Sequence, residues 1–405
     1  MTTQTGTTPT GNASRFLLVT ACALALAGCS TIKGWFGADE DDRPTEPAEL
    51  VEFTPSATVS RVWSASAGDG EGRIGARQGP VIADGRVYAA AFDGGVRAFD
   101  LQTGAEQWSY EPAEVEDEPR VRLSGGPGAG EGLVVVGGLD GEVIALDAAT
   151  GAEKWTAKVG GEVIAAPVIG GSMVFVRGND GRVTAFDAAS GERRWFWTRV
   201  MPALTVRGND SVVLGPGYVF VGNDDGTVAA ISMQDGSLIW EQAVGQAEGR
   251  SELERMADVD GTPVLDGAVL YASSFKGQTM AIDAPTGRPL WAHDSGGGGR
   301  LGNAGDRVIA TDRAGTVWAI NKADGGALWQ QPALARRNLT GAVVHGDYAV
   351  VGDFDGYLHW LRLSDGQFAV RAKTGGELLR ATPVVADGVL VVQNVDGQLS
   401  AFRLQ

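Results

Sequence analysis

Residues 93–108 of the chain read DGGVRAFDLQTGAEQW, and the pattern returns at 140–155 as DGEVIALDAATGAEKW and at 180–195 as DGRVTAFDAASGERRW. Each copy has a Gly turn, an alternating run of small and apolar residues that ends in Asp, a second turn closed by Gly, and a Trp. The alternation is the two-residue period of a half-buried strand, and Asp-x-x-Thr/Ser-Gly is typical of a tight turn. Each copy therefore predicts two antiparallel strands joined by a short turn.

The chain holds seven complete copies of this unit and a truncated eighth. The first Gly and the Trp keep the same separation in every complete copy, as at positions 94 and 108 or 141 and 155, and the seventh copy has Val370 in the Trp place after Gly356. The eighth copy begins at Asp396-Gly397 and stops at Gln405, before its Trp strand. A second apolar hairpin lies upstream, for example at residues 80–89 and 383–391, so each repeat has four short strands. Four-stranded repeats of about 40 to 50 residues are typical of β-propeller blades.

The missing strand of the eighth repeat can come from the other end of the chain. Trp63 ends the stretch 59–63, ahead of the first complete hairpin, and can fill the empty Trp position. The predicted fold is therefore all-β, an eight-bladed β-propeller of four-stranded repeats at residues 57–405, whose ring is closed by the N-terminal strand. The composition agrees, because 60 of the 405 residues are Gly, about twice the usual share, as a turn-rich β protein needs.

Composition and charge exclude several classes of function. The formal charge of −17, from 33 basic and 50 acidic residues, argues against nucleic-acid binding, which needs clustered cations. The only histidines, His293, His345 and His359, lack metal-ligand spacing. The repeated aspartates, such as Asp100 and Asp147, occupy one slot in successive blades, so we expect them to cap turns. The sequence therefore predicts no catalytic, cofactor or metal site.

Residues 1–28 have the pattern of an export signal. Arg15 precedes an apolar run at 16–26, which is too short to span a hydrocarbon core of about 30 Å. The run ends in Leu-Ala-Gly-Cys29, which resembles the lipobox of bacterial lipoproteins. The resemblance implies that residues 1–28 are removed and that Cys29 becomes the acylated first residue.

The residues after Cys29 indicate the destination and a tether. Ser30 follows the cysteine, and in diderm bacteria an aspartate there tends to hold a lipoprotein in the inner membrane. We therefore expect delivery to the outer membrane, on its periplasmic face. The stretch 29–56 contains four consecutive acidic residues and three prolines with little apolar patterning, so it predicts an acylated flexible tether.

The Ala-x-Asp-x-x-Thr-Gly-x-x-x-Trp unit resembles the repeat of the PQQ-type propellers, which occur in quinoprotein dehydrogenases and in non-enzymatic relatives. With a lipobox and eight blades, the chain is more similar to the BamB family, lipoproteins of the outer-membrane β-barrel assembly (Bam) machinery. Three stretches carry this resemblance more specifically than the repeat does: residues 201–208 (MPALTVRG), 252–263 (ELERMADVDGTP) and 352–360 (GDFDGYLHW).

The resemblance implies that the first two stretches bind the periplasmic POTRA region of BamA. The contact candidates are Leu204, Val206, Arg207, Asp258 and Asp260, although the family pattern favours Leu at position 206. The spacing of the repeats indicates the same region independently. Compact connections from the Trp of one blade to the first Gly of the next run over 155–181 or 291–315, whereas those over 195–226 and 240–277 are longer. Long connections on a rigid scaffold often carry binding residues, and we expect these two to be neighbours.

The resemblance thus implies a non-enzymatic scaffold lipoprotein of the Bam complex, without a cofactor, that assists folding and insertion of outer-membrane proteins. Its implied partners are a BamA-type protein, other Bam lipoproteins, unfolded outer-membrane protein clients and the membrane that holds the lipid anchor. Pairing of client strands with exposed blade edges is a further implication. Two alternatives remain open: a periplasmic ligand-binding or sensor propeller, and a PQQ-dependent dehydrogenase. The latter typically needs adjacent cysteines, but the only cysteines are Cys29 and Cys22, which lies in the export signal.

Overall fold

The computed structural model describes residues 1–4, 6, 46–72, 74–93, 95–113, 120–202, 204, 210–245, 257–376 and 378–405. They separate into a first unit, Met1–Glu46, and a compact unit, Pro47–Gln405. Cys29 and most of the predicted signal and tether lie outside the described residues. Within the described part of the chain, no helix has the length and apolar character that a membrane crossing requires.

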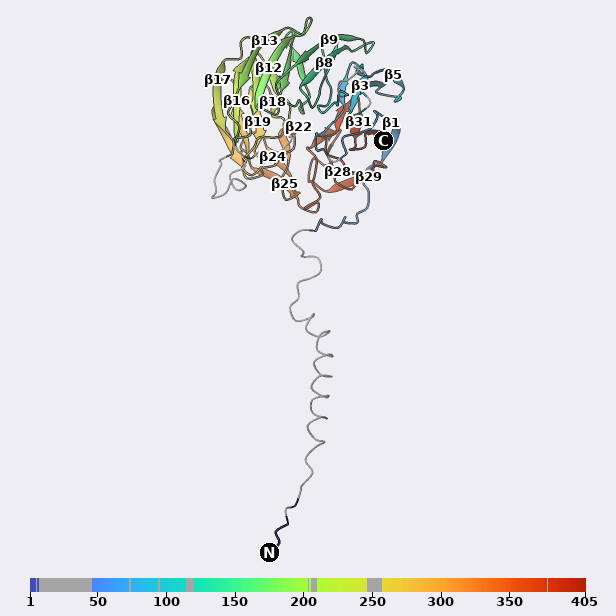
Figure 1. The fold of residues 1–405 in the computed structure, drawn as a ribbon, viewed down its shortest axis with the longest axis vertical. Coiled ribbons are helices and arrows are strands. Elements are labelled where there is room, and N and C mark those ends of the chain that lie inside the picture. The colour runs from blue at the N-terminus through green and yellow to red at the C-terminus, as the bar shows by residue number, and fades with distance from the viewer. Residues whose placement is uncertain are drawn as a thin grey trace. The chain divides into compact units, whose positions relative to one another are not determined.

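The compact unit is a ring of blades. Its described residues form 32 strands in eight four-stranded antiparallel sheets (Figure 1). The innermost strands of successive blades contact one another in cyclic order, and the last contacts the first. The predicted eight-bladed all-β propeller is therefore confirmed.

The strand bounds of blades 1 to 4, from the axis outward, are as follows. Blade 1 contains β2 (Val81–Ala83), β3 (Arg86–Ala91), β4 (Gly95–Asp100) and β5 (Glu106–Tyr110). Blade 2 contains β6 (Gly128–Gly130), β7 (Leu133–Gly137), β8 (Glu142–Asp147) and β9 (Glu153–Lys158). Blade 3 contains β10 (Val168–Gly170), β11 (Met173–Arg177), β12 (Arg182–Asp187) and β13 (Arg193–Thr198). Blade 4 contains β14 (Val213–Gly215), β15 (Tyr218–Gly222), β16 (Thr227–Ser232) and β17 (Leu238–Ala243).

Blades 5 to 8 follow the same order. Blade 5 contains β18 (Val264–Asp266), β19 (Val269–Ser273), β20 (Thr279–Asp283) and β21 (Pro289–His293). Blade 6 contains β22 (Gly302–Ala304), β23 (Arg307–Thr311), β24 (Val317–Asn321) and β25 (Ala327–Gln331). Blade 7 contains β26 (Val343–His345), β27 (Tyr348–Gly352), β28 (Tyr357–Arg362) and β29 (Phe368–Lys373). Blade 8 contains β30 (Val384–Ala386), β31 (Val389–Gln393) and β32 (Gln398–Leu404), completed by β1 (Val59–Ser66).

The outer hairpin of each blade pairs a small residue with a large one. Ala98 lies opposite Trp108 in the strand register, and the same Ala–Trp pair recurs in blades 2 to 6. The indole Nε1 of Trp108 donates a hydrogen bond to the carbonyl of Ala148 in the next blade, at 3.1 Å. The ring also covers the turn residue Gly151 of that blade, where a Cβ would lie 2.5 Å from the indole. The repeated Trp therefore joins one blade to the next.

Blade 7 exchanges the large and small residues of this pair. Trp360 lies opposite Val370, so the indole occupies the strand position that is Ala in the other blades. Its Nε1 donates to Nδ1 of His345 at 3.2 Å. Because Nδ1 accepts this bond, the proton of the His345 ring is on Nε2. Nε2 donates to the carbonyl of Gly388 in blade 8, at 3.1 Å. Burial lowers the pKa of His345, which keeps the ring neutral as this tautomer requires.

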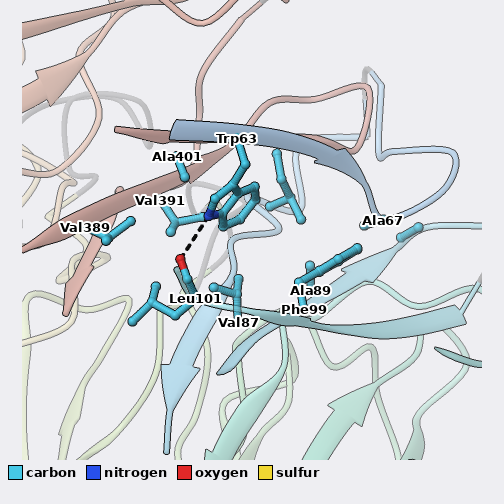
Figure 2. Close-up of a cluster of buried hydrophobic side chains, with 11 residues drawn as sticks. Trp63, Ala67, Val87, Ala89, Phe99, Leu101, Val389, Val391 and Ala401 are labelled. Atoms are coloured by element: carbon cyan, nitrogen blue, oxygen red, sulfur yellow. Dashed lines mark hydrogen bonds between the residues drawn. The ribbon is translucent and has the colours of Figure 1, made fainter. Parts of the chain in front are cut away.

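The two ends of the chain share blade 8, as predicted. β1 pairs with β32, and Trp63 lies opposite Ala401. Trp63 is buried in an apolar cluster, and its Nε1 donates to the carbonyl of Leu101 in blade 1 at 2.9 Å (Figure 2). Trp63 thus occupies the position that the eighth repeat lacks, and the ring is closed by its N-terminal strand.

The repeated aspartates cap turns. Oδ1 of Asp100 accepts hydrogen bonds from the backbone N–H of Thr103 at 2.8 Å and from its hydroxyl at 2.7 Å. These bonds favour the ionised carboxylate, so the pKa of Asp100 is lowered, chiefly by the Thr103 hydroxyl. Asp147, Asp187 and Asp283 make the equivalent bonds in their own blades. The predicted capping role is confirmed.

Part of the predicted tether is folded onto the propeller. Among residues 46–56, Leu50 and Phe53 pack in the apolar cluster between blades 6 and 7. The Phe53 ring stacks on that of Phe368 with centroids 5.4 Å apart, and Ser56 N–H donates to the carbonyl of Ala369 in β29. The compact unit therefore begins at Pro47, ahead of the expected boundary at 57.

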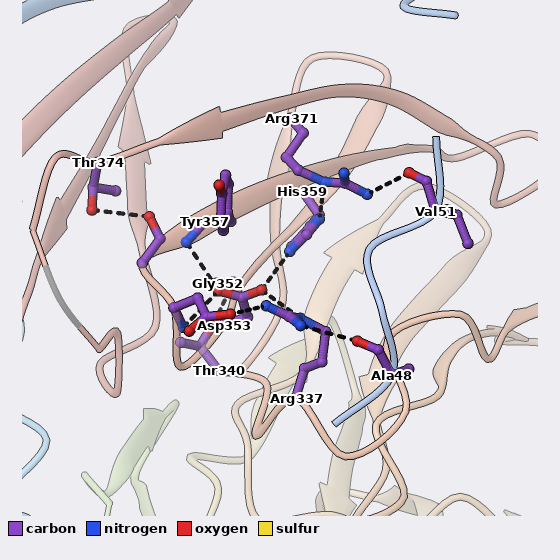
Figure 3. Close-up of polar contacts among 12 residues, drawn as sticks. Ala48, Val51, Arg337, Thr340, Gly352, Asp353, Tyr357, His359, Arg371 and Thr374 are labelled. Carbon is purple, nitrogen blue, oxygen red and sulfur yellow. Dashed lines mark hydrogen bonds and ion pairs between the residues drawn. The ribbon is translucent and has the colours of Figure 1, made fainter. Parts of the chain in front are cut away.

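A buried polar network holds this N-terminal segment (Figure 3). Arg337 donates from Nε to Oδ2 of Asp353 at 2.8 Å and from Nη1 to the carbonyl of Ala48 at 3.0 Å. His359 lies 3.0 Å from the same Asp353 oxygen, and its Nδ1 accepts from Arg371 Nε at 3.2 Å. Arg371 also donates to the carbonyl of Val51 at 3.2 Å. Asp353 and His359 belong to the stretch 352–360 that carries the family resemblance. This stretch therefore forms part of the surface on which the N-terminal segment packs.

The innermost strands of all eight blades surround a central cavity of about 1220 Å³. Residues from the connections between blades, including Arg77, Asp210, Thr262 and Gly298, also line it. This places the ends of the two long connections, at Asp210 and Thr262, beside the cavity.

Candidate partner-binding site

The first long connection, between β13 and β14, exposes apolar side chains. Leu204 is 43% exposed and Val200 is 90% exposed, while Phe196 on β13 is 50% exposed. Val206 and Arg207 lie outside the described residues. Exposed large apolar side chains close together in one segment are typical of a surface that a partner covers. The sequence prediction named Leu204 but missed Val200 and Phe196.

The second long connection, between β17 and β18, is pinned between two blades at its described end. Val259 N–H donates to the carbonyl of Asn223 in blade 4 at 3.0 Å. Phe275 N–H in blade 5 donates to the carbonyl of Asp258 at 2.7 Å, and the Ser274 hydroxyl donates to that of Ala257 at 2.6 Å. Backbone and side-chain groups of both blades therefore fix residues 257–259.

The structure brings the two connections together, as predicted. Asp210, at the end of the first, accepts through Oδ2 a hydrogen bond from Thr262 N–H of the second at 2.9 Å. Its backbone carbonyl accepts from Nη1 of Arg177 at 3.4 Å. Arg177 ends β11, is only 4% exposed, and pairs through Nη2 with Oδ1 of Asp224 at 3.4 Å. A buried guanidinium thus links blade 3, the first connection and blade 4.

Asp258 and Asp260 lie inside this junction rather than on the surface. Both side chains have 0% exposure, and between them Val259, 1% exposed, packs in the apolar cluster of blades 4 and 5. One carboxylate oxygen each of Asp224, Asp258 and Asp260 lies within 4.8 Å of the others. Three buried carboxyl groups therefore share one small volume.

Burial and mutual repulsion disfavour ionisation in this cluster. Burial raises the pKa of Asp260, Arg77 opposes this, and the charges of Asp258 and Asp224 add to it, so the pKa lies at about 8. Burial also raises the pKa of Asp224, opposed chiefly by Arg177. Burial lowers the pKa of Arg177, which the nearby carboxylates oppose. The junction is therefore an electrostatically coupled group of acids and guanidinium ions in a site that excludes water.

This placement changes the role expected for the two aspartates. We expected Asp258 and Asp260 to contact a partner directly, which requires exposed carboxylates. In the structure both are covered, so their chemistry supports the connection from within while Leu204 remains on the surface. No signal of this is present in the sequence, because alternation with Ala257 and Val259 would place the two aspartates on the opposite face of an extended segment, away from the core.

The fold and the repeat define a class, the eight-bladed β-propellers with PQQ-like repeats. The protein-family model described as outer membrane protein assembly factor BamB matches residues 45–122, 93–331 and 313–404. The chain therefore belongs to the BamB family.

Relatives along nearly the whole chain agree. The outer membrane protein assembly factor BamB of Xanthomonas campestris is 58% identical over 395 residues, 96% of this chain and 97% of the relative. That of Escherichia coli is 38% identical over 378 residues, 92% and 94% of the two chains.

Solved structures agree with this fold. The crystal structure of BamB from Moraxella catarrhalis superposes with a TM-score of 0.76 at 30% identity, covering 85% of this chain and 100% of that one. The quinohemoprotein alcohol dehydrogenase of Comamonas testosteroni gives a TM-score of 0.64 at 17% identity, covering 85% of this chain and 76% of that one. This second likeness shows the propeller fold alone.

Proposed function

We propose that the protein is a non-enzymatic scaffold of the outer-membrane β-barrel assembly complex, which binds the POTRA region of a BamA-type protein and assists folding and insertion of outer-membrane proteins. The observation that carries the proposal is the junction of the two long connections in a chain of the BamB family. Leu204 is exposed on the first connection, and hydrogen bonds of Arg177 and of the backbone of residues 257–259 fix the chain at the junction. Val206 and Arg207 of the same connection complete the proposed contact surface.

A rigid support explains how a small apolar contact can bind well. Affinity at protein interfaces depends on a few anchors, and ordering a loop on binding lowers the affinity. Hydrogen bonds to Asn223, Ser274 and Phe275 order residues 257–259 of the second connection before any partner arrives. In this proposal Asp258 and Asp260 belong to that buried support and do not contact the partner directly.

The proposal is tested by substituting Leu204 with a charge. Leu204→Asp should weaken capture of the purified POTRA region by about 30-fold, which corresponds to a hot-spot loss of about 2 kcal/mol. Leu328→Asp is a matched control, because Leu328 is also 43% exposed but lies on β25 in blade 6. Both variants should melt like the unsubstituted protein. Equal capture by Leu204→Asp and Leu328→Asp would refute this surface as the binding site.

We further propose that Cys29 carries the lipid that anchors the protein to the periplasmic face of the outer membrane, beside the other Bam lipoproteins and their unfolded clients. The Leu-Ala-Gly-Cys29 sequence supports this placement. Metabolic labelling with an alkyne palmitate should mark the protein, and Cys29→Ser should abolish the label and release the chain from membranes. A labelled Cys29→Ser variant would contradict the assignment.

A further inference from the structure

Asp260 has a buried carboxyl group that the described chain does not satisfy. The side chain has 0% exposure, and neither Oδ1 nor Oδ2 has a hydrogen-bond partner among the described residues. In Asp224, 4% exposed, Oδ2 is also buried without such a partner. Leaving a buried polar atom unsatisfied destabilises the folded state, and a charged one does so more strongly. A cation bound beside Asp260 and Asp224 would satisfy these oxygens.

The balance of charge around Asp260 also favours a bound cation. Among the described side chains coupled to this cluster, four carboxyl groups belong to Asp210, Asp224, Asp258 and Asp260, and two guanidinium groups belong to Arg177 and Arg77. Both guanidinium groups also donate hydrogen bonds to backbone carbonyls. Arg77 donates to that of Gly298 at 3.0 Å, and Arg177 donates to that of Asp210 at 3.4 Å. Among the described contacts, neither forms a hydrogen bond with Asp260. The acids of this group therefore outnumber its cations.

The ligand atoms select the kind of ion. Carboxylate oxygens without His or Cys favour hard cations such as Ca²⁺ and Mg²⁺. The three oxygens lie within 4.8 Å of one another, close enough for one ion to contact all three through bonds of about 2.4 Å. Ca²⁺ accepts irregular sets of oxygen ligands, whereas Mg²⁺ demands octahedral geometry and gives up its waters reluctantly. We propose that Asp224, Asp258 and Asp260 bind one Ca²⁺ in preference to Mg²⁺. The sequence predicted no metal site, because this cluster has no His or Cys spacing that could reveal it.

The proposed site lies close to the central cavity. Gly298 lines the cavity, and a Cβ built at this residue would lie 3.7 Å from Oδ2 of Asp260. The carboxyl group is therefore buried directly behind the cavity wall. Thr262 and Asp210 line the cavity on the same connections. Bound Ca²⁺ would tie the turn after β15 in blade 4, which holds Asp224, to the connection that holds Asp258 and Asp260.

Calcium titration of the full-length protein tests the proposal and does not depend on partner binding. The protein is stripped with EGTA, transferred to metal-free buffer at pH 8, and titrated with CaCl₂ and separately with MgCl₂ in a calorimeter. We expect one Ca²⁺ per chain and a weaker response to Mg²⁺. Asp260→Asn should weaken Ca²⁺ binding by at least about 100-fold, since outer-shell changes alone cost 10- to 100-fold.

Two controls separate loss of the ion from loss of the fold. Without Ca²⁺, Asp260→Asn should be at least as stable in urea as the unsubstituted protein, because it removes a buried unsatisfied acid. Glu71→Gln is the matched variant, since Glu71 is only 5% exposed, has an unpartnered Oε2 and a pKa raised by burial. It should bind Ca²⁺ normally. No Ca²⁺ binding up to about 10 mM, beyond the weakest protein sites near 1 mM, or unchanged binding by Asp260→Asn, would overturn the proposal.

Discussion

Replacing Gly104 by Ala tests how each Trp joins two blades. Gly104 has φ +71°, and a Cβ there would lie 2.6 Å from Cδ2 of Trp63, well inside the 3.5–4.0 Å of carbon contacts. The indole cannot easily retreat, because its Nε1 is bonded to the carbonyl of Leu101. A left-handed residue with a Cβ costs about 1–2 kcal/mol and overpacking another 1–3. Gly104→Ala should therefore destabilise the protein by about 2–5 kcal/mol.

Gly85→Ala is the matched control for the backbone contribution. Gly85 belongs to the same blade and has φ +73°, but a Cβ there would meet nothing within 4 Å. It should cost only the backbone part, about 1–2 kcal/mol. Urea unfolding followed by Trp fluorescence and circular dichroism measures both. In a Trp63→Ala background the cost of Gly104→Ala should fall to the Gly85→Ala value. Equal costs for the two glycine variants in the unsubstituted protein would refute the packing of Trp63 against this turn.

Three further predictions concern buried groups. Trp360→Ala should destabilise the protein by about 3–5 kcal/mol, and adding Val370→Trp should recover part of this loss in urea unfolding, because the pair then matches the other blades; no recovery would contradict the exchange of large and small residues. Burial alone would raise the pKa of Asp353, but hydrogen bonds from His359 and Arg337 hold it below the ordinary value. The ionised carboxylate therefore stabilises the folded protein above about pH 3.8, and this contribution is lost as the pH falls through the folded pKa. Asp353→Asn should therefore cost about 3 kcal/mol at pH 7 and much less in unfolding measured at low pH. For Asp260 the sign is opposite, because its folded pKa of about 8 exceeds the unfolded one. In Ca²⁺-free buffer the free energy of unfolding should therefore fall as the pH rises from about 4 to 8, by at most ~1.4 kcal/mol per pH unit. Urea unfolding of Asp260→Asn should not show this dependence on pH.

The repeat made the architecture predictable because one short pattern specifies both the hairpin and its contact with the next blade. The constant spacing from Gly to Trp contains both the Asp-capped turn and the residue opposite Ala98, so one pattern specifies hairpin, register and blade contact. The place of Trp63 followed from a simple absence in the eighth copy. Blade 7 departs from the repeat at Trp360 and Val370, and the strand register shows that these two positions face each other.

Two features could not be predicted because they depend on contacts distant in the sequence. Residues 47–56 have too few apolar side chains to show a period, and blade 7 supplies the partners of Leu50 and Phe53. Asp258 and Asp260 have the composition of an exposed acidic loop. Only the fold reveals that Arg177, from a strand of blade 3 much earlier in the chain, and Asp224 surround them.

The shared blade 8 has a consequence for the order of folding. Val59 pairs with Leu404, so the first strand to be synthesised finds its partner only when the last residues emerge. Closing a loop of this length costs roughly 5 kcal/mol in chain entropy by the logarithmic law. Blades 1 to 7 can each form from contiguous residues as they appear, whereas the ring can close only at the end. A chain that lacked β1 or β32 would therefore have an incomplete blade 8, and protease cleavage within β1 would distinguish unfinished from finished molecules.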